Sequence, residues 1–559
     1  MSLTIPELLQ QLATQPTSVD FATVIATIEQ HYNYTPQTFS NGVGDDCVIS
    51  PAGTNAGSCK VFAFGQLQGL SEQQTLLCFG EHYRKVLATP DETDHANIRT
   101  FMRHGWAGIR FEGVALQAVG HASAALQFIV QPGGHLQGRV RVPGDKSISH
   151  RSIMLGSLAD GTTHVSGFLQ GEDCLCTLKA FRSMGVDIEG PSANGEVTIH
   201  GVGLHGLQAP STDLDMGNSG TSMRLMSGLM SGQAFDVRMT GDASLSKRPM
   251  KRVTVPLASM GAVIEATSAG TPPLLVRGGK ALHGIDYAMP MASAQVKSSL
   301  LLAGLYAAGE TSVTEPAPTR DHTERMLRGF GYEVVTEGNR IRLQGGGRLT
   351  ATTIDVPSDI SSAAFFMVGA SIAEGSDLII EHVGINPTRT GVIDILRLMG
   401  ANLEVLNERE VGGEPVADIR VRSAALQGIQ IPEHLVPLAI DEFPALFIAA
   451  AFAQGQTVLT GAEELRVKES DRIQVMADGL IACGVDAQPT PDGIVINPGN
   501  FSGGTIESHG DHRIAMSFAM AALRATQPII INDCANVNTS FPGFVELAAT
   551  AGVNIRTVG

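Results

Sequence analysis

The sequence predicts an α/β protein in which six related βαβαββ-type repeats form two halves of three repeats each, after a small α-rich N-terminal module. The first supporting observation is a series of short motifs, each followed by a helix of small and apolar residues, at intervals of about 70 residues. A helix that is apolar all round belongs inside a layer. The predicted helix starts are Asp145, Asn218, Ser293, Asp359, Asp441 and Asp511.

A second series marks the ends of amphipathic helices. In each case a glycine follows the helix and a strand-like run begins directly after it. Glycine after a helix adopts the left-handed backbone that a helix C-terminus requires. The six glycines are Gly185, Gly261, Gly331, Gly400, Gly484 and Gly552, and they predict the same six repeats as the helix starts.

The strongest internal match divides the repeat region into halves. VPGDKSISH, starting at Val142, matches VPSDISSAA, starting at Val356, so the two Val-Pro segments are expected to be crossovers between halves. We predict that residues 126–144 and 357–559 form one half and residues 145–356 the other. If the buried helices of each half run side by side, six helix N-termini can face one cleft, where an anion would bind.

Composition excludes several function classes. The net charge of −17 argues against nonspecific nucleic-acid binding and against attraction to an anionic membrane. No apolar run reaches the length of a membrane span, and the first basic residue is Lys60, so no basic leader is expected. Seven cysteines fit a reducing compartment, and we predict a cytoplasmic protein, a monomer, with no metal or cofactor.

Residues 1–125 form the predicted N-terminal module. Helices are expected at residues 5–12, 19–32, 71–87 and 95–104, a loop at 41–57, a strand at 59–64, and a linker at 114–126. The segments NAGSCKVFAFGQLQGLSEQQTLLCFGEHYRKVL and DHANIRTFMRHGWAGIRF resemble the HopJ type III effector family. Four histidines (His31, His82, His95 and His104) lack ligand spacing and are interpreted as structural. The sequence does not indicate what this module does.

Basic residues gather at the predicted helix starts of the second region, although the chain is acidic overall. Phosphate groups are bound by Arg and Lys side chains together with backbone N–H groups. RVKESDR alone fits an exposed salt-bridged helix face equally well, and the glycines, serines and aspartates alone fit ordinary turns and caps. The six-fold context favours a binding cleft, in which Lys146, Asp441 and Glu469 are the available proton carriers.

Eight motifs in order resemble the 5-enolpyruvylshikimate-3-phosphate synthase family over about residues 127–559: GDKSISHR, GNSGTSMRL, SLSKRPM, ASAQVKS, TRDHTE, IDEFP, RVKESDR and GDHRIAM. The resemblance implies a two-domain enolpyruvyl transferase fold. It also implies transfer of the enolpyruvyl group of phosphoenolpyruvate to the 5-hydroxyl of shikimate 3-phosphate, with release of phosphate, in the shikimate pathway of aromatic amino acid biosynthesis.

The resemblance also implies the site residues. Shikimate 3-phosphate would contact Lys146, Ser147, Arg151, Ser293, Gln295, Arg320, Asp441 and Lys468. Phosphoenolpyruvate would contact Lys146, Gly220, Thr221, Arg248, Arg472 and Arg513. The implied catalytic residues are Lys146, Asp441 and Glu469, and which of them moves each proton stays open.

Two departures separate this chain from the plant and enteric-type members. Ser293-Ala294-Gln295 stands where they have a double serine before the glutamine, and Thr539-Ser540 stands where they have a lysine before Phe541-Pro542. Both changes indicate the other main subgroup, some of whose members tolerate glyphosate and often have alanine at the position of Gly220. Because this chain has glycine there, we predict inhibition by glyphosate.

Two alternatives stay open from the sequence. One is the sister transferase that acts on UDP-N-acetylglucosamine, although it uses a loop cysteine, and Cys174 and Cys176 lie in the wrong repeat. The other is an inactive scaffold that acts through residues 1–125. GVGLHG at residues 201–206 fits a dinucleotide fingerprint, but no helix is expected after it, and no GxxxxGK[ST] or HExxH motif is present.

Overall fold

The computed structural model describes residues 5–44, 46–68, 70–111, 113, 115–118 and 126–559. The chain forms two compact units, Met1–Ala124 and Ala125–Gly559. Within the described residues, no helix is long and apolar enough to cross a membrane.

The first unit is mainly helical, and its described helices are α1 (Ile5–Thr14), α2 (Phe21–His31), α3 (Ala56–Leu67), α4 (Glu72–Leu77), α5 (Glu81–Ala88) and α6 (Ala96–His104). Strand β1 (Tyr32–Tyr34) pairs with β5 (Leu116–Ala118). Strands β2 (Phe39–Val43), β3 (Asp46–Ser50) and β4 (Arg110–Phe111) form a second small sheet.

Three details of this unit differ from the sequence predictions. The strand predicted at residues 59–64 is wrong, because these residues lie in α3, where most of them are buried. A short apolar run does not distinguish a buried helix from a strand. The predicted loop at 41–57 overlaps the hairpin of β2 and β3, which begins at Phe39. The helix predicted at 71–87 is broken at Gly80, whose φ is 55°. Val114 and residues 119–125 of the predicted linker lie outside the described residues.

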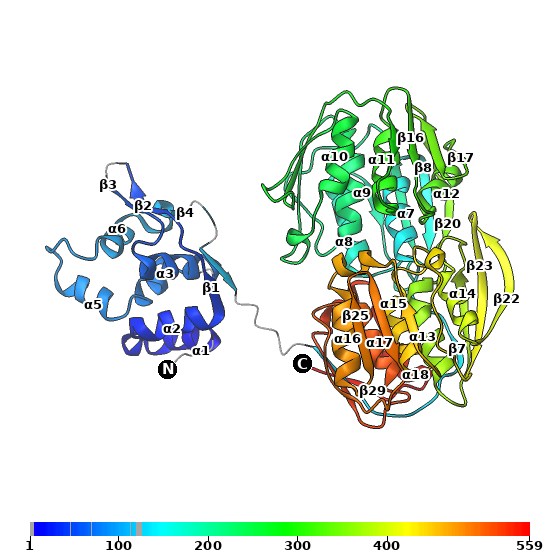
Figure 1. The fold of residues 1–559 in the computed structure, drawn as a ribbon. Coiled ribbons are helices and arrows are strands. Elements are labelled where there is room, and N and C mark those ends of the chain that lie inside the picture. The colour runs from blue at the N-terminus through cyan, green and yellow to red at the C-terminus, as the bar shows by residue number, and fades with distance from the viewer. Residues whose placement is uncertain (1–4, 45, 69, 112, 114, 119–125) are drawn as a thin grey trace. The chain divides into compact units, whose positions relative to one another are not determined.

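The second unit contains the repeats, and its six apolar helices begin where the sequence predicts them, within two residues. They are α7 (Lys146–Leu158), α9 (Gly220–Ser231) and α11 (Ala294–Gly304) in one half, and α13 (Ile360–Ile372), α15 (Phe443–Ala451) and α17 (His512–Ala521) in the other. Figure 1 shows the first set in the upper half of this unit and the second set in the lower half.

The six amphipathic helices lie outside the apolar ones. They are α8 (Glu172–Ser183), α10 (Lys251–Ser259), α12 (His322–Gly329), α14 (Gly391–Leu398), α16 (Arg472–Ala482) and α18 (Phe544–Ala551). Each of the six predicted glycines follows one of them with a positive φ, from 78° at Gly331 to 124° at Gly552. Both sequence series are therefore confirmed.

Three sheets belong to the central half, and in each a parallel pair is followed by two antiparallel strands. Their strands, in sheet order, are β19 (Leu349–Thr350), β8 (Ala159–Ser166), β10 (Val197–Val202) and β9 (Asp187–Glu189), with β20 (Thr353–Asp355) beside β8; β11 (Leu214–Asp215), β12 (Val237–Thr240), β14 (Leu274–Arg277) and β13 (Val263–Glu265); and β15 (Asp286–Ala288), β16 (Glu310–Thr314), β18 (Arg340–Gln344) and β17 (Val335–Glu337).

Two sheets of the other half repeat the pattern, and the third has only the antiparallel strands, with isolated parallel bridges in place of the parallel strand. Its sheets are β7 (Gln137–Val140), β21 (Asp377–Gly384), β23 (Glu414–Arg422) and β22 (Asn402–Val411); β24 (Thr457–Leu459), β26 (Gly493–Asn497) and β25 (Asp486–Thr490); and β27 (Gly504–Glu507), β28 (Ile529–Asn532), β6 (Gln127–Val130) and β29 (Ile555–Val558). The early strands β6 and β7 thus complete sheets of the later half. The predicted α/β fold of βαβαββ-type repeats is confirmed.

Two hydrophobic cores accompany the two halves. One contains Phe128 to Val142 together with residues from Ile360 to Ile555, and the other contains residues from Ile148 to Val356. This separation supports the proposed division at residues 144–145 and 356–357.

Candidate active site between the two halves

A cavity of about 110 Å³ lies between the halves, and residues at or beside all six apolar helix N-termini line it. The central half contributes Lys146, Ser147, Asp173, Asn218, Gly220, Thr221, Arg224, Arg248, Arg252, Gln295 and Arg320. The other half contributes Asp359, Ser361, Arg389, Asp441, Glu464, Val467, Lys468, Glu469, Arg472, His512 and Arg513. The positive ends of the helix dipoles therefore lie beside a high density of cationic side chains, a combination that favours bound anions.

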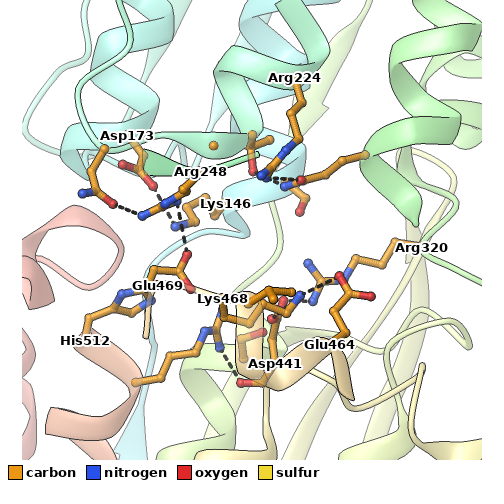
Figure 2. Close-up of a pocket in the computed structure, with 18 of the residues that line it drawn as sticks. Lys146, Asp173, Arg224, Arg248, Arg320, Asp441, Glu464, Lys468, Glu469 and His512 are labelled. Carbon is orange, nitrogen blue, oxygen red and sulfur yellow. Dashed lines mark hydrogen bonds and ion pairs between the residues drawn. The ribbon is translucent and has the colours of Figure 1, made fainter. Parts of the chain in front are cut away.

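On the central side, the α7 N-terminus carries Lys146 into the cavity. Its Nζ donates to Asp173 Oδ2 at 2.8 Å, and its backbone N–H donates to Asp359 Oδ2 of the other half at 3.0 Å. Arg248 donates to Asn218 Oδ1 at 2.6 Å. Figure 2 shows Lys146, Arg248 and Arg224 gathered on this side of the cavity.

The opposite side is organised around two carboxylates, Asp441 and Glu469. Asp441 pairs with Arg320 across the cavity, with Arg472 at 3.2 Å and with Lys468 at 3.6 Å. Glu469 accepts from Arg472 Nη2 at 2.7 Å and lies 3.8 Å from Arg248 of the central half. Figure 2 shows Glu469, Lys468 and Asp441 facing the cations of the other side.

These carboxylates are held in the ionised form. Burial raises the pKa of Asp441, but Lys468, Arg320, Arg513 and Arg472 outweigh burial and hold that pKa well below its ordinary value. Burial likewise acts against ionisation of Glu469, and Arg472 and Arg248 keep its pKa well below the usual range. Both groups are therefore proton acceptors near neutral pH.

Lys146 and His512 have the opposite protonation states near neutral pH. Burial lowers the pKa of Lys146, but Asp173 and Glu469 more than compensate, so its pKa is raised and the group is a protonated ammonium. Burial, together with Lys146 and Arg513, lowers the pKa of His512 to about 3, so its imidazole is neutral. The cavity thus places the Lys146 ammonium, a potential proton donor, together with the Asp441 and Glu469 carboxylates, which are potential acceptors.

The sequence-predicted site residues are brought together with two exceptions. Arg151 is buried behind Ser147, where its Nη1 donates to the Ser147 carbonyl at 2.9 Å. Ser293 caps α11 through Val296 N at 3.4 Å and does not line the cavity. Gln295 does line it, and bridges Arg224 at 2.7 Å and Thr221 at 3.1 Å.

Several lining residues had no assigned role in the sequence interpretation. Asp173 opens the amphipathic helix α8, and the sequence locates helices of this kind only by the glycine after them. Arg252 lies in the first turn of α10, whereas Arg248 lies in extended backbone before that helix, so helical spacing does not connect the two. Nothing in the turn around Arg389 signals a buried position, since its partners Asp145 and Asp359 are distant in sequence.

Comparison with known proteins assigns the second unit. Residues 130–547 match the family model described as EPSP synthase (3-phosphoshikimate 1-carboxyvinyltransferase). The chain belongs to the EPSP synthase family. The 3-phosphoshikimate 1-carboxyvinyltransferases of Methylococcus capsulatus and Alkalilimnicola ehrlichii are 71% and 70% identical to it over 429 residues, which cover 77% of this chain and 98% and 96% of those proteins. The solved EPSP synthase from Acinetobacter baumannii is 66% identical, with a TM-score of 0.71, and covers 78% of this chain and 100% of its own.

The match confirms the predicted family and decides between the two enolpyruvyl transferases weighed from the sequence. The chain is a 3-phosphoshikimate 1-carboxyvinyltransferase rather than the UDP-N-acetylglucosamine enzyme. Residues 5–116 match the family model for HopJ type III effector protein, which confirms the fusion of the two units.

Asp511 gives a test of the charge arrangement. It is fully buried, caps α17, and accepts from Arg472 Nε at 2.9 Å. Asp511→Asn is expected to lower the free energy of unfolding by about 3 kcal/mol at pH 7, because a buried cation loses a charged partner. Urea unfolding measures this change, and Asp478→Asn, on the exposed face of α16, is the control.

The pH dependence of that effect has a defined sign. Burial raises the pKa of Asp511, but nearby charges, chiefly Arg472, lower that pKa by more than burial raises it, so the net shift is downward. A lowered pKa stabilises the fold above the unfolded-state value of about 4 and loses this effect as the pH falls. The difference between wild type and Asp511→Asn should therefore shrink below about pH 4, and a difference that grows there would contradict the assignment.

Proposed function

We propose that the cavity between the halves is where the family's reaction takes place in this chain. The enolpyruvyl group of phosphoenolpyruvate is transferred to the 5-hydroxyl of shikimate 3-phosphate, and phosphate is released. The observation that supports this most directly is the meeting of six helix N-termini and cations from both halves around two ionised carboxylates. Two phosphorylated anions need such a site.

The proposed substrate contacts follow the family motifs. Shikimate 3-phosphate is assigned to Lys146, Ser147, Arg151, Ser293, Gln295, Arg320, Asp441 and Lys468. Phosphoenolpyruvate is assigned to Lys146, Gly220, Thr221, Arg248, Arg472 and Arg513. Arg151 and Ser293 stay in this proposed set although neither lines the cavity; Arg151 donates to the Ser147 carbonyl, and Ser293 caps the first turn of α11.

The protonation states favour specific roles for the proton carriers. Asp441, as a carboxylate, accepts the proton of the 5-hydroxyl while that oxygen bonds to C2 of phosphoenolpyruvate. Lys146, as an ammonium, donates a proton to the methylene carbon, and a tetrahedral ketal forms. The bond between C2 and the phosphate ester oxygen then breaks, and its electron pair leaves with phosphate. Glu469 or neutral Lys146 removes a methyl proton, and that C–H electron pair restores the double bond. The cationic walls stabilise the charge that develops on the phosphate.

A cytoplasmic location and a monomeric state are part of the same proposal. All seven cysteines are free, which is compatible with a reducing compartment. The division into residues 1–125, 126–144 with 357–559, and 145–356 is likewise proposed, and the separate hydrophobic cores support it.

Lys146→Met is expected to reduce phosphate release from the two substrates by about 100- to 10,000-fold, because it removes the proton donor. The measurement is steady-state phosphate release with both substrates saturating. Lys179→Met, an exposed lysine on α8, is the control and should retain activity. Equal activity of the Lys146 variant would exclude this mechanism. Inactivity of the wild type would instead favour the scaffold alternative.

A protein that begins at Leu126 is expected to keep its kcat within about twofold of the full chain, because the second unit has its own cores and all the proposed site residues. The same phosphate-release assay tests this. A folded but inactive truncated protein would show that the first unit contributes to the site.

Glyphosate is expected to inhibit the wild type below millimolar concentration, and Gly220→Ala is expected to raise the inhibitory concentration by about tenfold or more. A Cβ at residue 220 would lie 3.0 Å from Arg224 Nη1 and 3.1 Å from Arg248 Nη1, so a methyl group narrows the site proposed for phosphoenolpyruvate. Inhibition curves at fixed phosphoenolpyruvate measure the change. Gly329→Ala has open space around its Cβ and is the control.

A further inference from the structure

The turn Asn386–Arg389, between β21 and α14, contains two buried polar side chains that reach the opposite half. Asn386 is 2% exposed and Arg389 is 3% exposed. A buried guanidinium is costly unless it is paired and fully hydrogen-bonded, so its contacts identify what it holds in place.

Arg389 joins the N-caps of the two crossover helices. Its Nη1 donates to Asp145 Oδ2 at 2.9 Å, and its Nη2 donates to Asp359 Oδ1 at 3.0 Å. Asp145 caps α7 in the central half, and Asp359 caps α13 in the other half. The second oxygen of Asp359 accepts the backbone N–H of Lys146 at 3.0 Å. Arg389 therefore contacts two residues that hold Lys146. Asp145 precedes Lys146 in the chain, and Asp359 accepts the Lys146 backbone N–H.

Asn386, in the same turn, contacts the residue that follows Arg320 in the chain. Its Nδ2 donates to Asp321 Oδ1 of the central half at 2.7 Å and to Glu414 Oε2 at 3.0 Å. Glu414 in turn contacts His322 Nδ1 at 2.9 Å. The same turn thus contacts Asp145 and Asp321, which are the chain neighbours of Lys146 and Arg320. Lys146 and Arg320 are both proposed substrate contacts in the central half.

Two further features connect this turn to the cavity. Arg389 lines it, and its Nη2 donates to Ser361 Oγ at 2.7 Å, which also contacts Glu442 beside Asp441. Arg389 Nε and Glu442 Oε2 are buried without a hydrogen-bond partner among the described residues. Arg389 therefore does not satisfy all of its own hydrogen bonds, and we interpret its contacts as serving the position of the residues that it joins.

We propose that Arg389 is a positioning residue for the reaction, which holds Lys146 in register with Asp441 across the two halves. The inference rests on the proposed function of the cavity and adds a residue to it that contacts no reacting atom. Loss of the guanidinium fork removes the cation that joins the Asp145 and Asp359 carboxylates, so the two carboxylates repel each other and the first turn of α7, which Asp145 caps, shifts. A displacement of about 1 Å at a reacting group can cost 100-fold in rate.

Arg389→Lys tests the proposal, because lysine keeps a positive charge near Asp145, Asp359 and Glu442 but cannot make the two-pronged contact. We expect kcat to fall by about 10- to 100-fold, with smaller changes in the two KM values. Arg397→Lys is the matched control, because Arg397 is an exposed arginine on α14, the helix that follows the Arg389 turn. An active wild type and control establish the function, and full activity of Arg389→Lys would then overturn only the positioning role.

A second readout separates positioning from simple stabilisation and does not need turnover. Burial lowers the pKa of the Lys146 ammonium, but the contact with Asp173, together with Glu469, raises that pKa by more. Displacement of Lys146 away from Asp173 should therefore lower the pKa. We expect a ¹³Cε NMR titration, with the Lys146 resonance assigned by Lys146→Met, to show a lower pKa in Arg389→Lys and no change in Arg397→Lys. A folded Arg389→Lys protein with reduced stability but an unchanged Lys146 titration and kcat would contradict the proposal.

Discussion

The arrangement of the whole second unit depends on the pairing of its two crossover segments. Asp145 N donates to the Pro357 carbonyl at 2.8 Å, and Asp359 N donates to the Pro143 carbonyl at 2.9 Å, so the two Val-Pro-x-Asp segments bind one another reciprocally. Each aspartate then caps an apolar helix. Because the caps are paired, the N-termini of α7 and α13 are brought to the same place.

This pairing creates an electrostatic problem that Arg389 resolves. Two buried aspartates lie close together, and like charges in a low-dielectric region cannot both ionise without a cation. Burial raises the pKa of Asp145, yet the nearby Arg389 and His322 lower it overall, so the carboxylate stays charged and its helix cap stays strong. The same solution recurs in the cavity, where Arg472 joins Asp441, Glu469 and Asp511.

The sequence predicts the periodic part of this structure and misses the contacts between repeats. Helix caps and the glycines after helices depend on neighbours within a few residues, and for that reason the positions of α7 and α13 and the left-handed Gly400 were predictable. The helix α3 was mistaken for a strand because its burial depends on tertiary packing, which an apolar run does not reveal.

The residues of the candidate site also fall into those that the sequence identifies and those that it does not. Lys146 and Asp441 stand at repeated helix starts and could be identified from spacing and family motifs, whereas Asp173 reaches Lys146 from a different helix start. Arg389 could not be identified, since its partner Asp145 lies 244 residues away in the chain. A single sequence contains no signal for a contact made only when both halves have folded.

The charges that cross the cavity explain why the site needs both halves. Arg320 pairs with Asp441, Arg248 lies 3.8 Å from Glu469, and Arg252 lies 3.7 Å from Glu464. Each pair takes its cation from the central half and its carboxylate from the other half. Separation of the halves would leave cations facing cations among Arg224, Arg248 and Arg252, and burial with these neighbours already lowers the pKa of Arg224 to about 10. An anion that enters the cavity supplies the negative charge these arginines lack, so substrate binding and the meeting of the halves favour each other through the same electrostatic term.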